Sequence, residues 1–321
     1  MSQPIILCAS DLRFAWGQGL PSLLRLAADS GFSGIWVGSS CAQRDLPQLV
    51  AQAAGSGLSV PVAHAPLPEA PISPGRRLPH LCAPDDIDER LTAIKLVEST
   101  WTAASPLGIS EFVLDLGAVT LRGEPSAIAN WFSRRELDED EAGHRSWTNM
   151  LAERRALSPV LVDACRYALD RLLPRAEAAG FSLSIEVTGP WSAPTPREAE
   201  ALLDEYRGGP LSIVWDEARV QALGALGLGI GTERRAVLAK STRVVRCHEA
   251  VGAVTGYLPG LGDPDGHGLF PLDVKKDGAE TPRSAPSFAV VSGFLDSSDE
   301  EVSRARAAVA RRWGNNDTPA A

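Results

Sequence analysis

The chain has 321 residues, of which 44% are hydrophobic, and it carries a formal net charge of −9 at neutral pH. This length and apolar content are typical of one α/β barrel with a large core, and an acidic chain without a basic stripe argues against nucleic acid as a partner. The sequence has no apolar run of about 18 residues and no signal peptide, which predicts no membrane segment and favours a cytoplasmic location.

Eight short apolar runs alternate with longer helical patterns along the chain. Near-continuous hydrophobic runs are typical of parallel strands buried on both faces, and their alternation with helices indicates βαβ units. We therefore predict an α/β fold, a (β/α)8 TIM barrel, that forms one domain over residues 1–313 and is followed by a disordered tail over 314–321. The predicted strands begin at Ile5, Gly34, Ser59, Glu111, Ser182, Leu211, Arg243 and Ser287.

Helix signals and long connections lie between these strands. Ser158-Pro159 predicts the start of a long helix that ends at Gly180, and Thr195-Pro196-Arg197-Glu198 has the pattern of a capping box with proline at the first helical position. The segments 66–87 and 118–157 are longer than ordinary connections. Both follow strands, so we expect them to lie as lids over the carboxyl end of the barrel.

Three predicted strands end in a potential metal ligand. SLSIEVTG presents Glu186, LSIVWDEA presents Asp216 and RVVRCHEAV presents His248. Side chains at the carboxyl ends of parallel barrel strands converge on one mouth, and a hard divalent cation takes carboxylates with an imidazole. Glu186 also has the position of a general base for a carbon acid beside a carbonyl. The alternative is a set of salt-bridged carboxylates and a hydrogen-bonded histidine at the rim.

Four further residues are predicted to bind or orient a substrate. His64 ends the third strand and Asp115 ends the fourth, and both face the mouth. Arg246 has the same parity as His248, so it points inward. An arginine inside an acidic barrel is either a structural counter-charge or a clamp for a carboxylate or phosphate, and Arg219, just past the sixth strand, presents the same two alternatives.

Several segments resemble the xylose isomerase-like barrels and, within them, the sugar phosphate isomerase/epimerase family. GFSGIWV, AEAAGFSLSIEV and VVRCHEAVGAVTGYLPGLGDPD are similar to that family's second-, fifth- and seventh-strand signatures, and the similarity covers nearly the whole chain. It implies a divalent metal (manganese, magnesium, zinc or cobalt) held by Glu186, Asp216, His248 and a glutamate from the eighth strand. The two glutamates would also be the pair of bases that remove and return a proton beside the substrate carbonyl.

The chain departs from this family at three positions. Ser292 stands at the eighth-strand position, Arg219 stands where a histidine follows the sixth-strand aspartate, and Trp36 replaces a second-strand glutamate. A hydroxyl is a poorer ligand than a carboxylate. A two-base exchange also needs a carboxylate on each face of the carbon, and only Glu186 is identified here.

The predicted function is a divergent isomerase or epimerase that moves a proton beside the carbonyl of a small polyol or sugar-like metabolite, assisted by a metal. The alternative is a barrel that has lost isomerase activity and binds a metabolite or partner protein, or catalyses a lyase, hydrolase or metal-free reaction. Endonuclease IV shares this barrel, but its site has many histidines, whereas this acidic chain has five. The substrate, the metal and the oligomeric state stay open.

Overall fold

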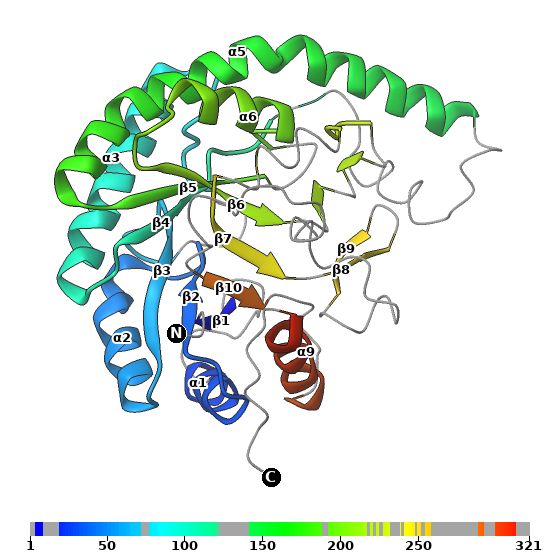
Figure 1. Ribbon diagram of the computed structural model, residues 1–321. Helices are drawn as coiled ribbons and strands as arrows, with labels where there is room; N and C mark the ends of the chain where they lie inside the picture. Colours follow the sequence, from blue (N-terminus) through cyan, green and yellow to red (C-terminus); the bar gives the residue numbers. More distant parts are fainter. Residues whose placement is uncertain are drawn as a thin grey trace.

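A closed barrel of eight parallel strands lies at the centre of the fold (Figure 1). The computed structural model describes residues 4–8, 19–71, 77–119, 121, 141–187, 192–216, 219–220, 223–224, 227–231, 238, 241–247, 249–251, 254–257, 288–291 and 299–312. Around the barrel each strand pairs in parallel with its two neighbours, and β10 closes the circle between β7 and β1. The barrel strands are β1 (Ile5–Cys8), β2 (Gly34–Val37), β3 (Ser59–Ala65), β4 (Glu111–Leu114), β5 (Ser182–Glu186), β6 (Leu211–Asp216), β7 (Thr242–Cys247) and β10 (Phe288–Val291).

The described helices surround the barrel on its outside (Figure 1). The predicted capping box is present, because the Thr195 side chain accepts from the Glu198 backbone and the Glu198 carboxylate accepts from the Thr195 backbone. The two exchanged hydrogen bonds fix where helix α6 (Pro196–Glu205) begins. The helices are α1 (Leu20–Asp29), α2 (Leu46–Gly55), α3 (Ile87–Ala104), α5 (Glu141–Ala179), α6 (Pro196–Glu205) and α9 (Asp299–Arg312), with short 3-10 turns η1 (Gln43–Asp45) and η2 (Ser105–Leu107).

The strands separate two hydrophobic cores, because successive side chains point to opposite faces of a strand. One core lies between barrel and helices and includes Leu7, Ile35 and Phe112. The other fills the barrel interior. Its members are Ile6, Cys8, Trp36, Val62, Val113, Val214, Val244 and Val290. Every second residue of a barrel strand therefore faces the interior, and this parity decides which polar side chains can meet there.

Helix α5 differs most from the sequence-based expectation. It begins at Glu141 instead of Ser158, so much of the segment 118–157 is helix and not loop. The side chains of Trp147 and Met150 are buried, which holds the additional turns against the protein. The Ser158 hydroxyl donates to the Glu198 carboxylate at 2.6 Å, so it links two helices where a helix start was predicted.

The region after β7 also differs from the prediction of one strand running to Val251. β7 ends at Cys247, and β8 (Glu249–Val251) pairs antiparallel with β9 (Val254–Tyr257) as a separate hairpin. Among the described residues a helix follows every barrel strand except β6 and β7, whose following segments are described only in part. The parallel barrel is thus confirmed, whereas the complete (β/α)8 repeat stays a prediction. The predicted tail, 314–321, lies outside the described residues.

The described helices contain no candidate membrane span. Within the described ranges, none has an apolar stretch of the length and purity that crossing a bilayer requires.

Candidate functional site

Four polar side chains enter the barrel interior near the carboxyl ends of the strands. Glu186 and Asp216 are the last residues of β5 and β6, and His64 and Arg246 each come one residue before the end of β3 and β7. All four are buried. Each lies two residues beyond an inward-facing residue of its strand, so the period of two directs it inward. The structure therefore brings together four of the residues predicted from sequence.

Glu186 lies among two arginines and a histidine. Arg219 donates from Nη1 to Oε1 of Glu186 at 2.9 Å, and Arg246 donates from Nη1 to the same oxygen. On the other side, Nε2 of His64 lies 3.9 Å from Oε2. Only 3% of the Glu186 side chain is exposed, so this carboxylate interacts with fixed protein groups in a site shielded from water.

Asp216 binds Arg219 through both of its oxygens. The backbone N–H of Arg219 donates to Oδ1 at 3.0 Å, and Nε lies 3.3 Å from Oδ2. An acceptor three residues before the backbone donor has the geometry of a helix N-cap, which fixes the position of the Arg219 backbone. The Arg219 guanidinium bridges Asp216 and Glu186.

Trp36 forms the floor beneath these charges. Its ring stacks on His64 with centroids 5.0 Å apart and an interplanar angle of 26°. The Arg246 guanidinium carbon lies 5.4 Å from the Trp36 ring centroid, and Nη2 of Arg246 lies 3.9 Å from the sulfur of Cys8. An aromatic face in this position stabilises a cation and also limits how far Arg246 and His64 can move.

Burial and neighbouring charges act on Glu186 in opposite directions. Burial raises the pKa of the carboxyl because desolvation disfavours its charged form, and Asp216 adds to this effect. Arg246, Arg219 and His64 favour the anion and together outweigh burial, so the pKa of Glu186 lies below its ordinary value of 4.5. Glu186 is therefore a carboxylate at neutral pH, which is the form a general base requires.

Asp115 is placed apart from this cluster. β4 ends at Leu114, and Asp115 is exposed, with Oδ1 accepting from the backbone of Gly117 at 3.0 Å. It lines a neighbouring cavity of about 230 Å³ together with Arg77 and His80. Burial and then Arg77 lower the pKa of His80 from 6.5, although Glu89 and Asp115 oppose this. The prediction that Asp115 contacts a substrate stays a prediction.

His248 and Ser292, predicted as a metal ligand and as the residue at the fourth-ligand position, lie outside the described residues. Their predicted roles stay predictions.

Comparison with solved structures supports the fold. The E. coli 3-keto-D-glucoside 4-epimerase has a TM-score of 0.59 at 14% identity over 96% of this chain and 99% of that one. D-Allulose 3-epimerase from Methylomonas sp., solved with D-allulose, gives 0.59 at 15% identity over 98% and 97%. A xylose isomerase domain protein from Planctomyces limnophilus gives 0.55 at 15% identity over 98% and 99%. The chain has the xylose isomerase-like fold.

Sequence comparison adds nothing to this result. No protein-family profile matches the chain, and a search of curated proteins finds no significant match. The xylose isomerase-like fold is therefore assigned from structure alone.

The described residues of this xylose isomerase-like fold do not fit the divalent cation that the resemblance implies. The Arg219 guanidinium already bridges the two acids that would bind it. At an effective dielectric of about 20, a divalent cation about 4 Å from one guanidinium meets a repulsion of roughly 8 kcal/mol, as large as its attraction to one carboxylate. The repulsion from Arg219 and Arg246 thus offsets the attraction of Glu186 and Asp216 for a divalent cation. Within the described ranges no group of three or more His, Cys, Asp or Glu side chains is placed to hold a metal.

Sequence reasoning missed a second polar network inside the barrel, at its amino end. Ser184 donates to Glu111 Oε1 at 3.0 Å and lies 2.7 Å from the Ser212 hydroxyl, while Arg243 donates from Nε to Glu111 Oε2 at 2.8 Å. Burial raises the pKa of Glu111 above 4.5 although Arg243 and Ser184 favour its anion. A signal was present, because Glu111 has the same parity as the inward-facing Val113.

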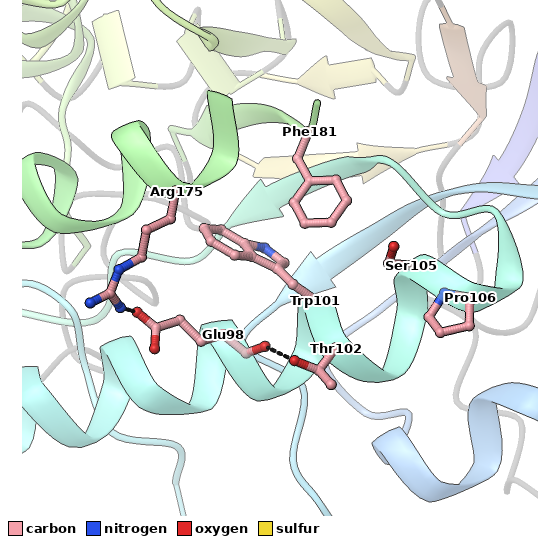
Figure 2. A pocket seen from close by; sticks show the side chains of 7 residues that line it. All are labelled: Glu98, Trp101, Thr102, Ser105, Pro106, Arg175 and Phe181. Carbon is pink, nitrogen blue, oxygen red and sulfur yellow. Dashed lines mark hydrogen bonds and ion pairs between the residues drawn. The ribbon is translucent and has the colours of Figure 1, made fainter. Parts of the chain in front are cut away.

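Another cavity lies on the outer surface between α3 and α5 (Figure 2). It has a volume of about 590 Å³, and Trp101 and Phe181 form its apolar side while Arg175 pairs with Glu98 at its edge. Its residues lie just before the amino ends of β4 and β5. Barrel enzymes carry their active sites at the opposite, carboxyl end, so this groove is not the candidate site.

Proposed function

We propose that the protein binds a small polyhydroxylated carbonyl compound at the carboxyl end of its barrel and transfers a proton at the carbon beside the carbonyl, as an isomerase or epimerase does. The observation that carries this proposal is the ionised Glu186, buried at the end of β5 and held between Arg219 and Arg246. We also propose that the complete fold is a (β/α)8 TIM barrel, in which such an end is the usual place of the active site.

Glu186 is the proposed base. Its lowered pKa keeps it ionised, and burial removes water that would otherwise compete for the proton. His64, 3.9 Å from Glu186 Oε2, is the proposed group that orients the carboxylate or a substrate hydroxyl. The neighbouring structures include epimerases of sugars, one of them solved with its ketose, and this supports the proposed substrate class. No step of the proposal uses a metal, although the metal roles of Glu186, Asp216 and His248 stay predictions.

The proposal is tested by hydrogen exchange with solvent. Ketoses, aldoses and keto-polyols, with D-fructose and D-allulose among them, are incubated with the protein in D2O, and NMR follows deuterium at the carbon beside each carbonyl. We expect exchange with at least one compound and a rate at least about 100-fold lower for Glu186→Gln, because a general base is removed. The proposal is wrong if the variant and the wild type exchange at equal rates.

A second candidate is a barrel that binds such a compound without turnover. It is favoured by the same arginines, because a carboxylate with a lowered pKa is a weaker base. A ligand that raises the melting temperature of the wild-type protein and shows no deuterium exchange would support binding alone.

A further inference from the structure

The guanidinium of Arg219 lies between the two acids on which this fold would lead us to expect a metal ion. It is 2.9 Å from Glu186 Oε1 and 3.3 Å from Asp216 Oδ2. Arg246, whose side chain is 3% exposed, donates to the same Glu186 oxygen. We propose that the guanidiniums of Arg219 and Arg246 take the place of a divalent cation, so that proton transfer in this barrel is metal-independent. This inference rests on the proposed function and deepens it.

The charges of the cluster support this assignment. Glu186 and Asp216 are matched by Arg219 and Arg246, which stay protonated over the whole accessible pH range. A cation would have to expel a guanidinium that is held at both ends, by Glu186 and by Asp216. The arginines supply positive charge at the same place, and they need no metal supply.

The proton transfer itself moves one negative charge within this cluster. The C–H bond beside the carbonyl breaks, and its proton goes to a carboxylate oxygen of Glu186. The electron pair of that bond becomes the carbon–carbon double bond of an enolate, and the carbonyl π pair moves onto the oxygen. Return of the proton to carbon restores the carbonyl and the Glu186 carboxylate. The charge leaves Glu186 and appears on the substrate oxygen, so one guanidinium can stabilise both states.

The two arginines have different roles because they differ in access. The Arg219 side chain is 19% exposed, so of the two guanidiniums it is the one that a substrate oxygen can reach. The Arg246 side chain is 3% exposed and lies against Trp36 and Cys8. Arg246 is thus a positioning residue that acts through Glu186.

The experiment combines metal analysis with the deuterium-exchange assay. Protein purified without a chelator is analysed for metal by mass spectrometry. It is then treated with EDTA and titrated with Mn²⁺ under electron paramagnetic resonance, and exchange is measured before EDTA, after EDTA and with added Mn²⁺, Mg²⁺, Zn²⁺ or Co²⁺. We expect less than about 0.1 equivalent of bound metal. Exchange should stay within about twofold under all these conditions, because the guanidinium charge does not depend on a metal.

Variants distinguish a role of the Arg219 charge in proton transfer from a merely structural role of this side chain. Arg219→Gln should lower the maximal exchange rate about 100-fold, whereas Arg219→Lys, which keeps the charge, should recover at least about tenfold of that loss. Arg219→Gln should also gain Mn²⁺ binding, since the guanidinium that bridges Glu186 and Asp216 is then gone. Arg243→Gln, which removes a guanidinium from the buried glutamate at the other end of the barrel, is the matched control and should leave exchange unchanged.

Stoichiometric metal in the wild-type protein, with exchange abolished by EDTA and restored by Mn²⁺, overturns the inference and leaves the proposed function standing. Absence of exchange with every compound, with or without metal, overturns the proposed function instead. In that case the Mn²⁺ titration still tests whether the two guanidiniums occupy the position of a divalent cation. Binding by Arg219→Gln and not by wild type supports their position, and equal binding by both overturns it.

Discussion

The barrel interior holds a buried glutamate at each end, and the two are governed by different neighbours. Glu186 at the carboxyl end is 3% exposed and meets two guanidiniums and a histidine. Glu111 at the amino end is equally buried, but its guanidinium partner among the described residues, Arg243, is 43% exposed. The pKa of Glu186 lies below 4.5 and that of Glu111 lies above it.

This difference shows that burial alone does not set the charge state inside the barrel. Desolvation is the largest influence on both carboxyls, and it raises both pKa values. At Glu186 two guanidiniums outweigh it, whereas at Glu111 one half-exposed guanidinium and the Ser184 hydroxyl do not. The carboxyl end is thus built to keep an anion.

The largest expected effect concerns catalysis. Glu186→Gln should lower the deuterium-exchange rate by about 10²- to 10⁴-fold, because the proposed base loses its negative charge. Glu111→Gln removes a carboxylate of the same burial from the other end and should change the rate by less than about threefold. Circular dichroism checks that both variants fold. Equal losses in the two variants would mean that Glu186 acts only through stability.

The next effect concerns stability. Arg246→Met leaves Glu186 buried with less compensation and should lower the free energy of unfolding by about 3–5 kcal/mol. Arg243→Met removes a half-exposed partner of Glu111 and should cost less than about 1 kcal/mol. Urea unfolding followed by tryptophan fluorescence measures both. A larger loss of unfolding free energy for Arg243→Met than for Arg246→Met would contradict the difference proposed between the two glutamates.

The contributions of Glu186 and Glu111 to the free energy of unfolding should also change with pH in opposite directions. The contribution of ionised Glu186 is present above pH 4.5 and is lost as pH falls through its lower folded-state pKa, so the cost of Glu186→Gln should shrink in acid. Glu111 favours folding when protonated, so its contribution is lost as pH rises above 4.5 through its raised pKa. The Glu111→Gln variant should therefore gain stability relative to wild type as pH rises. Urea titrations between about pH 3 and about pH 7 test both slopes, and slopes of the same sign would contradict this account.

The smallest effect concerns one hydroxyl at the amino end. Ser184→Ala removes the hydrogen bond of 3.0 Å to Glu111 and should cost about 1 kcal/mol. Because Ser184 favours the anion, its loss should raise the pKa of Glu111 further and move the pH dependence upward. Thermal unfolding at several pH values detects the change. An unchanged pH dependence would show that the Ser184 hydroxyl does not influence the pKa of Glu111.

Strand parity made most of the candidate site predictable. Eight apolar runs predicted the barrel strands, and a period of two placed His64, Glu186, Asp216 and Arg246 inside it. The alternation of inward and outward side chains could not be extended past the end of a strand, and β4 ends earlier than predicted. Asp115 follows the last residue of β4, and its carboxylate accepts from its own turn.

Two features depend on tertiary packing that a local pattern does not contain. The bridging position of Arg219 is set by the turn that Asp216 caps, so sequence could name the arginine but not choose between counter-charge and substrate clamp. The early start of α5 depends on burial of Trp147 and Met150 against distant segments. Ser158-Pro159 is a good local signal for a helix start, and these contacts override it.

The shared oxygen of Glu186 has a consequence for how this protein can change during evolution. Oε1 accepts from both Arg219 and Arg246, so a substitution at any of the three leaves a buried charge with less compensation. Such changes are tolerated only when a second change accompanies them. Among descendants of a common ancestor, these three positions should therefore be inherited as a unit, and a lineage with a histidine at position 219 should also lack the arginine at position 246.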